Sequence, residues 1–362
     1  MNNPIDDIKK LHPGVFLQEQ LKTENMSQHD LAVRTGVTEK HISTIIAGTK
    51  AISVSFAKRL EYALAPEAKF WLEKQSLYDC ALAEFGEEND ITAEETKTLK
   101  SLKEVIDYYK ELGWVNEKLT DFEMVLNLRK IMGTSNLSAI PNISYDAAYR
   151  AQVKKNSNVD PYVLYAWQRT CELLTKDIVV ADELNVEMLK QRLDEMKKLM
   201  FEDIATISEK LTQILSECGI AFKIVRNFVG APVQGFIKKT DAGKIILCIT
   251  LRGKKADGFW FTFFHEIGHI INNDLNTRFV DIKAEGSLME VAADDFARNC
   301  LLNEKDYVNF LMNRDFSLMA IQRFALSQNV KPFVVIGRLH KEEILEWNVY
   351  DNEIDRYDWA LA

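Results

Sequence analysis

Two histidines and a glutamate within five consecutive residues carry the strongest chemical signal in this sequence. Residues 265–269 read His-Glu-Ile-Gly-His inside an apolar run from Phe259 to Ile271. On a helix, positions i and i+4 share a face, so His265 and His269 can bind one zinc ion. Glu266 would stand beside them as the base that takes a proton from an attacking water. About 0.01 matches to this motif are expected by chance in a chain of this length and composition. The motif therefore favours a catalytic zinc site.

A catalytic zinc takes three protein ligands and leaves one position open. The metzincin pattern is excluded as a source of the third ligand, because Leu275 stands where its last histidine would be. Residues 290–302 instead offer Glu290 and Asp294, four positions apart and therefore on one helical face. We expect Glu290 to complete the ligand set and Asp294 to bind the second ring nitrogen of a ligand histidine. For an oxyanion donor the sequence offers only His340, a lone histidine near a helix end.

The motif and the acidic helix together resemble the ImmA/IrrE family of zinc metallopeptidases. The resemblance rests on H-E-I-G-H, followed about 20 residues later by E-x-x-A-D-x-F-A-x-x-x-L. It extends through 245–250, 259–264 and 332–339, and it covers roughly residues 200–350. It implies a peptidase that acts on repressor proteins. Relatives often carry a further histidine where this chain has Asn272-Asn273-Asp274, so no role of that histidine is carried over.

Residues 27–48 show the pattern of two short helices joined by a tight turn. Ser27 and Thr38 are predicted to cap the helices, and Gly36 to permit the turn. The pattern resembles the helix-turn-helix of phage-repressor-like regulators, and residues 12–72 resemble its antitoxin-type branch. Polar residues at the front of the second helix would then face the DNA major groove. The predicted DNA contacts are Gln28, Thr38, Glu39, Lys40, Ser43, Thr44 and Lys50.

Composition limits the class of protein. The net charge of −9 gives no global basic surface, and the acidic and basic residues are nearly balanced through residue 85. The five cysteines are scattered without a C-x-x-C pair, which indicates reduced thiols. We find neither a signal-peptide core nor a run of about 18 apolar residues. These features predict a cytoplasmic protein with no membrane contact.

The predicted fold class is mainly α with a small antiparallel β-sheet, an α+β architecture. Three short segments rich in branched residues predict the sheet, at 220–225, 233–238 and 244–250. The last of these could accept an extended substrate as an added strand. The predicted domains are a helix-turn-helix domain at 1–85, a linker at 86–93, a helical middle at 94–199, a zincin-like metallopeptidase at 200–350 and a tail at 351–362.

Two functions compete on this evidence. The first is a zinc endopeptidase whose helix-turn-helix binds DNA, such as its own promoter, and which cleaves a repressor, an antitoxin or its own residues 86–92. The second is a DNA-binding regulator or antitoxin, paired with a toxin, whose peptidase-like domain only senses a metal or ligand. The intact Glu266 favours the first, because a sensor needs no base. A third possibility is that the helix-turn-helix contacts another protein. We expect a homodimer in each case.

Overall fold

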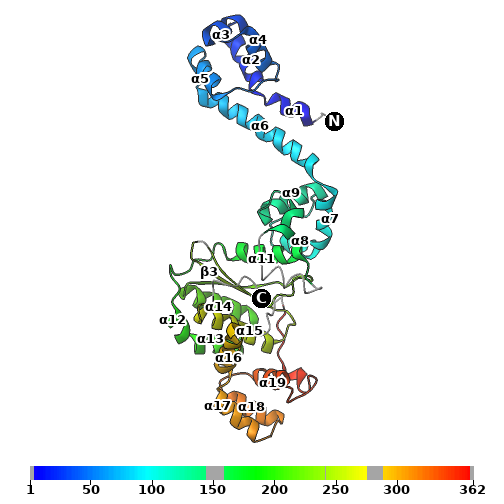
Figure 1. The fold of residues 1–362 in the computed structure, drawn as a ribbon, viewed down its shortest axis with the longest axis vertical. Coiled ribbons are helices and arrows are strands. Elements are labelled where there is room, and N and C mark those ends of the chain that lie inside the picture. The colour runs from blue at the N-terminus through cyan, green and yellow to red at the C-terminus, as the bar shows by residue number, and fades with distance from the viewer. Residues whose placement is uncertain (1–3, 144–158, 241, 275–287, 359–362) are drawn as a thin grey trace. The chain divides into compact units, whose positions relative to one another are not determined.

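The computed structural model describes residues 4–143, 159–240, 242–274 and 288–358. The chain divides into two compact units, Met1–Ala93 and Glu94–Ala362, which we treat separately. Helices dominate both, and one three-stranded sheet lies in the second (Figure 1). The α+β class predicted from the sequence is thus confirmed. Within the described residues, no helix is long and apolar enough to cross a membrane. The helix predicted at 144–154 lies outside the described residues.

The first unit is a bundle of short helices around a core that includes Leu31, Ile42 and Trp71, all fully buried. Helix α3 (Gln28–Thr35) lies between Ser27 and Gly36, and α4 (Glu39–Ile46) begins directly after Thr38, as the sequence predicts. Ser27 and Thr38 accept hydrogen bonds from the third backbone amide of α3 and α4, and Gly36 adopts a left-handed conformation with φ of 65°. The helices are α1 (Pro4–Lys10), α2 (Pro13–Thr23), α3 (Gln28–Thr35), α4 (Glu39–Ile46), α5 (Val54–Ala63) and α6 (Ala68–Asp90).

The linker predicted at 86–93 stays a prediction, and most of this segment is helical. Helix α6 continues through Gly86 as far as Asp90, and α7 begins at Ala93. A glycine inside a helix costs only about 1 kcal/mol relative to alanine, so one glycine among polar residues need not end a helix. The division between the two compact units nevertheless falls next to this segment.

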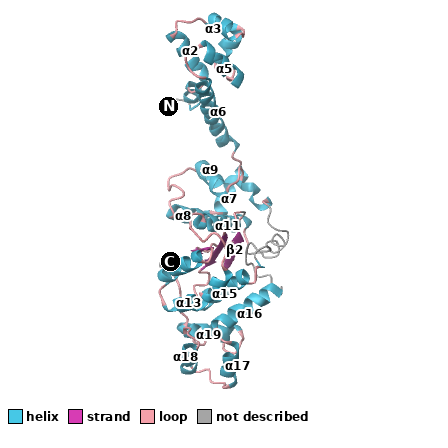
Figure 2. Ribbon diagram, turned by 90° about the vertical axis from the view of Figure 1, so that its left-hand side faces the viewer, coloured by secondary structure: helices cyan, strands magenta, loops and turns pink. Residues whose placement is uncertain are grey.

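The second unit is built from helices that precede, cover and follow the sheet (Figure 2). Before the sheet come α7 (Ala93–Ser101), α8 (Lys103–Glu111), α9 (Asp121–Met132), η1 (Leu137–Asn142), α11 (Pro161–Thr175), α12 (Val186–Gln191), α13 (Leu193–Lys198), η2 (Leu199–Phe201) and α14 (Ile204–Glu217). After it come α15 (Ala256–Ile271), α16 (Leu288–Leu301), α17 (Glu304–Met312), α18 (Leu318–Ser327), α19 (Pro332–Lys341) and η4 (Asp351–Glu353).

The sheet is mixed, which corrects the antiparallel sheet predicted from the sequence. Its strands are β1 (Ile220–Val225), β2 (Gly235–Lys239) and β3 (Ile245–Thr250), in the order β1-β3-β2. Strand β2 is antiparallel to β3, but β1 is parallel to β3, with Ile220 opposite Ile245. The connection after β1 therefore carries the chain past β3 to the far edge. All six residues of β3 are buried, as expected for a central strand covered on both faces.

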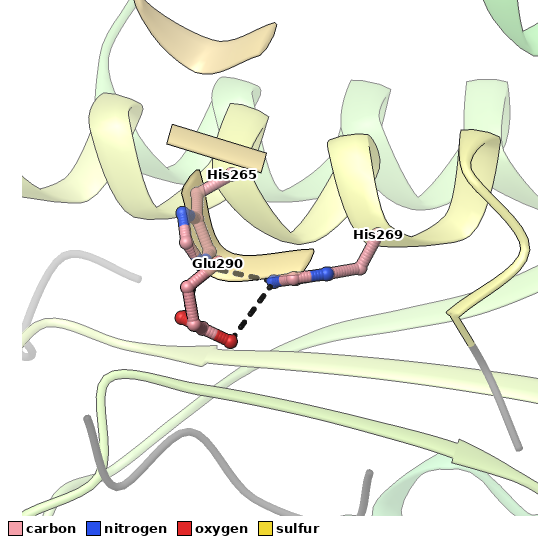
Figure 3. A group of neighbouring side chains, drawn as sticks. All are labelled: His265, His269 and Glu290. Carbon is pink, nitrogen blue, oxygen red and sulfur yellow. Dashed lines mark hydrogen bonds and ion pairs between the residues drawn. The ribbon is translucent and has the colours of Figure 1, made fainter. Parts of the chain in front are cut away.

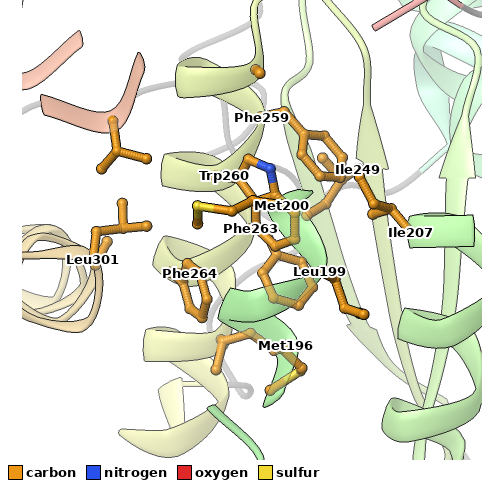
Figure 4. Packing of buried hydrophobic residues seen from close by; sticks show 14 of the residues in the cluster. Met196, Leu199, Met200, Ile207, Ile249, Phe259, Trp260, Phe263, Phe264 and Leu301 are labelled. Carbon is orange, nitrogen blue, oxygen red and sulfur yellow. The ribbon is translucent and has the colours of Figure 1, made fainter. Parts of the chain in front are cut away.

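Helix α11 covers one face of the sheet, and α14 and α15 cover the other (Figures 1 and 2). On the α15 side, Trp260, Phe263 and Phe264 pack with Ile249 in one large core (Figure 4). The aromatic run before the motif is therefore mostly core, since only Phe261 of its last residues remains partly exposed. This packing fixes the helix that carries the metal-binding motif.

The predicted boundary between the helical middle and the peptidase, at 199/200, stays a prediction. In the structure, Leu189 and Met196 from the predicted middle are fully buried in the same core as Trp260. Helix α11, also from the predicted middle, packs on β1 and β3. Residues 94–362 accordingly form one compact unit.

Candidate metal centre and helix-turn-helix

Helices α15 and α16 pack closely because small residues line their contact. Ala293 and Ala297 of α16 are fully buried, as their spacing predicts. Gly268 lies where Phe296 crosses α15: a β-carbon at residue 268 would come within 3.0 Å of the Phe296 ring. The glycine inside the His-Glu-Ile-Gly-His motif is therefore a packing residue, and it lets α16 bring its first turn towards the two histidines.

His265, His269 and Glu290 converge on one point (Figure 3). The Nε2 atoms of the two histidines are 3.0 Å apart. The carboxylate oxygens of Glu290 lie 3.5 Å from His265 Nε2 and 3.7 Å from His269 Nε2. Both histidines are buried, with 5% and 1% of their surface exposed. This group could hold a metal ion.

The other ring nitrogen of each histidine faces a carboxylate. Asp294 Oδ1 lies 2.8 Å from His265 Nδ1, and this hydrogen bond is the main cause that lowers the pKa of the Asp294 carboxyl. Asp274 Oδ2 lies 3.1 Å from His269 Nδ1. In the neutral rings each Nδ1–H would donate to its carboxylate, which leaves the Nε2 lone pairs directed at one another.

Asp274 is a residue that the sequence reasoning missed. It follows His269 by five positions in the polar segment Asn272-Asn273-Asp274, which the sequence marks only as a departure from the family pattern. Its nearness to His269 depends on the turn after α15, where Asn273 adopts a positive φ of 60°. The signal that could have identified Asp274 in the sequence is the position of its carboxylate, directly after the motif helix.

The residues present fit a zinc ion. Two Nε2 lone pairs and a carboxylate directed at one point repel each other unless a proton or a cation lies between them. Ligands bound tetrahedrally at the usual Zn–N distance are about 3.3 Å apart, and the three distances given above lie around that value. Nitrogen and carboxylate donors with a carboxylate behind each histidine are the usual surroundings of catalytic zinc.

The carboxylate of Glu266 lies against the start of β2. A β-carbon built at Gly235 would lie 2.1 Å from Glu266 Oε1, so the carboxylate rests against the backbone of that strand. Glu266 is 2% exposed. The carboxylate is thus buried where α15 packs against the edge strand β2.

The strand predicted to accept an extended substrate is not available. Strand β3 pairs with β1 on one side and with β2 on the other, so its backbone donors and acceptors are already used. Strand β2 lies at the edge of the sheet, and among the described residues it pairs with β3 alone. The edge next to Glu266 is therefore β2.

His340, the residue considered as an oxyanion donor, is not available for that role. It is fully buried in α19, and its Nε2 lies 2.8 Å from the carbonyl oxygen of Val349. A side chain held inside the core in this way supports the last turn of α19 instead of facing a substrate.

A cavity of about 580 Å³ opens beside the candidate metal position. His265 and Glu290 line it, together with Asp294 and faces of α15, α16 and α19. Its size is within the usual range for a ligand pocket. No sequence pattern indicates this cavity, because its walls come from segments that are far apart along the chain.

In the first unit, the predicted DNA contacts lie at the surface around the start of α4. Thr38, Glu39, Lys40, Ser43 and Lys50 are exposed, while Gln28 and Thr44 are partly exposed. The hydroxyl groups of Ser43 and Thr44 donate to the carbonyl oxygens of Lys40 and His41. Their oxygen atoms can still accept hydrogen bonds.

Some of the basic residues near this surface already form ion pairs or hydrogen bonds with other groups of the protein. Lys58 forms an ion pair with Glu61, and Arg59 Nη1 donates to the carbonyl oxygen of Thr35 at 3.1 Å. Lys50 Nζ lies 3.0 Å from His41 Nδ1. Burial, followed by the charges of Lys50 and Arg59, lowers the pKa of His41, which favours a neutral imidazole that accepts from Lys50.

Comparison with known proteins gives matches to part of the chain. Residues 17–64 match the model of a helix-turn-helix family. Virulence-associated protein I of Dichelobacter nodosus is 32% identical over 80 residues, which are 22% of this chain and 74% of the relative. A solved structure from Nostoc punctiforme, described as a candidate antidote protein of a plasmid maintenance system, is 28% identical. That match covers 22% of this chain and 87% of the other, with a TM-score of 0.21. Through its N-terminal unit, the chain belongs to the helix-turn-helix family.

Proposed function

We propose that this protein is a cytosolic zinc-dependent endopeptidase fused to a DNA-binding helix-turn-helix, and that it regulates transcription by cleaving a repressor or antitoxin. The observation that carries the proposal is the convergence of His265, His269 and Glu290, with Glu266 beside them. A structural zinc site is usually closed by four protein ligands, whereas three of the residues that the structure describes form this group, and a cavity adjoins it. We further propose that residues 200–350 are an ImmA/IrrE-type peptidase domain.

Zinc bound by these three residues would polarise a peptide carbonyl and lower the pKa of a water molecule at the open position. The protein's own residues would orient the metal ligands and transfer the proton. Asp294 and Asp274 hold the two imidazoles through Nδ1, so that both Nε2 atoms stay directed at the metal position. This arrangement fixes the tautomer of both rings before any metal or substrate arrives.

Glu266 is the proposed general base and acid. From its place against the start of β2, one residue after His265, it would take a proton from the attacking water and pass it to the leaving amine. Its burial against Gly235 restricts the rotamers of the carboxylate, so that it is oriented in advance for proton transfer.

An extended substrate would lie along the outer edge of β2. Backbone hydrogen bonds from an added strand would align the peptide. Because Gly235 begins β2 and touches Glu266, such a peptide would place a carbonyl group close to the general base. The substrate that we propose is a partner repressor or antitoxin, or the chain's own residues 86–92.

The helix-turn-helix would bring this activity to DNA. We propose that Gln28 and Lys50 bind phosphate, and that Thr38, Glu39, Lys40, Ser43 and Thr44 lie at the major groove of an operator, such as the protein's own promoter. Helix-turn-helix proteins bind paired half-sites as dimers, so we propose a homodimer on DNA. A toxin encoded nearby would be a further partner.

The substitution Glu266→Gln tests the proposal. The amide keeps the shape of the side chain but removes the proton acceptor, so cleavage should fall by about 10² to 10⁴ while zinc content and DNA binding stay unchanged. The measurement is co-expression with the product of the neighbouring gene, followed by mass spectrometry of its fragments. Identical fragments from wild type and Glu266→Gln would show that another enzyme cuts the substrate.

That last outcome would favour the second candidate function, a DNA-binding regulator or antitoxin with a metal-sensing domain. The match of residues 17–64 to the helix-turn-helix family supports this function as well as the first. Metal-dependent binding to the promoter by both proteins, with no cleavage by either, would be its signature.

A further inference from the structure

The cavity beside the candidate metal position is an elongated groove along α15. The residues of α15 that line it recur at about every fourth position, from Asp257 through Phe261 to His265. Eight residues of helix span about 12 Å. An extended peptide advances about 3.3 Å per residue, so the groove can take about three residues of a substrate next to the metal.

Both basic and acidic side chains line the groove. Five basic side chains line it, and three of these are matched by carboxylates. Lys255 is paired with Asp351, Arg298 with Asp295, and Arg338 with both Glu304 and Glu342. The basic residues that line the groove are Arg252, Lys255, Arg298, Arg338 and Lys341.

Arg252 and Lys341 are not matched in this way. In the part of the chain that the structure describes, neither forms an ion pair with a carboxylate, and Arg252 Nη1 donates to the carbonyl oxygen of Pro232 at 3.0 Å. Both side chains are exposed and line the groove. Lys341 lines the same cavity as Asp294 and His265.

The acidic residues that line the groove are Asp257, Glu290, Asp294 and Glu342. Asp294 is bound to His265, and Glu342 is bound to Arg338. Burial raises the pKa of the Asp257 carboxyl. A divalent metal at Glu290 would add further positive charge to the same end of the groove.

We infer that the groove selects substrates that carry an acidic residue within three positions of the cleaved bond. The inference rests on the proposed endopeptidase and names the chemistry of its substrate. Arg252 and Lys341 would bind the carboxylate, while Phe261, Leu301 and Val334 provide apolar walls for the rest of the peptide. The chain's own residues 86–92, one of the proposed substrates, contain Glu87, Glu88 and Asp90.

A peptide library tests the inference. Zinc-loaded full-length protein is incubated with peptides from a digested proteome, and the cleaved bonds are identified by mass spectrometry. Asp and Glu should be enriched about three- to fivefold at one position within three residues of the cleaved bond, the factor expected for one partly exposed ion pair. The double substitution Arg252→Glu with Lys341→Glu should abolish this preference. Lys305→Glu is the matched control, because Lys305 is exposed on α17 and does not line the groove.

The possible outcomes distinguish a failure of the inferred acidic preference from a failure of the proposed endopeptidase. Cleavage without acidic enrichment, or a preference that survives the double substitution, overturns the inference and leaves the endopeptidase standing. An acidic preference that Lys305→Glu also abolishes would mean that net charge, and not the groove, sets it. If the zinc-loaded protein cleaves no peptide, the endopeptidase is contradicted and the inference falls with it.

Discussion

The carboxylate of Glu266 lies so close to the backbone of Gly235 that residue 235 has no room for a β-carbon. A β-carbon there would lie 2.1 Å from Oε1 and 2.6 Å from Cδ of Glu266. Gly235 is the first residue of the edge strand β2, and Glu266 follows the first histidine of the motif. The sheet edge and the candidate general base are therefore in direct contact, 31 positions apart in the sequence.

This contact predicts the effect of Gly235→Ala. The added methyl group must displace the Glu266 carboxylate, so peptide cleavage should fall at least tenfold, towards the loss expected for removing the base. Zinc content should not change, because Glu266 is not among the three converging residues. Gly86→Ala is the control, since nothing lies within 4 Å of a β-carbon there. Full activity in Gly235→Ala would mean that Glu266 reaches its working position by another route.

The convergence of His265, His269 and Glu290 predicts one zinc per chain. His269→Ala should lose most of the metal, as measured by elemental analysis of the purified protein, whereas His29→Ala in the exposed surface of α3 should retain it. Chelation should lower the Tm of the second unit, because a metal that binds only the folded state stabilises that state. Full zinc occupancy in Glu290→Ala would remove Glu290 from the ligand set.

The carboxylates of Asp274 and Asp294, which face the Nδ1 atoms of the two histidines, predict a smaller loss of zinc affinity than the removal of a metal ligand. Asp274→Asn and Asp294→Asn should each reduce zinc affinity by about 10- to 100-fold, because the amide no longer fixes the tautomer and basicity of its histidine. Titration against a zinc-sensitive dye would measure this change. Asp295→Asn is a close control, since Asp295 is next to Asp294 but is paired with Arg298 and contacts neither histidine. Equal affinity in all three variants would show that neither carboxylate supports the site.

The surface of α4 predicts a salt-dependent interaction with DNA. Lys40→Ala should weaken binding to the promoter and reduce the salt slope by about 1, as expected for the loss of one phosphate or groove contact. Ser43→Ala should cost about 1–3 kcal/mol only on the correct operator if it reads a base edge. Gel shifts at several salt concentrations measure both, with Lys69→Ala on α6 as the control. Failure of the wild type to bind any duplex at any salt concentration would favour a protein-binding role.

The sequence by itself determined the features that depend on helix geometry. The spacing of His265 and His269 places both on one face of α15, whatever packs against it. In the same way, Ser27, Gly36 and Thr38 specify the turn between α3 and α4 through capping and left-handed backbone geometry. These signals act over a few residues, so the linear sequence contains all of the information that they need.

Only the tertiary structure decided which distant segments meet. Hydrophobic patterning identified β1 and β3 as strands, but it could not specify that they are parallel, because the relative direction of two strands depends on the path of the chain that connects them. The contacts of Asp274 with His269 and of Gly235 with Glu266 depend on a turn and on the position of the edge strand. The groove likewise exists only because α15, α16 and α19 pack together, and packing between helices follows from the shape of whole surfaces and not from local spacing.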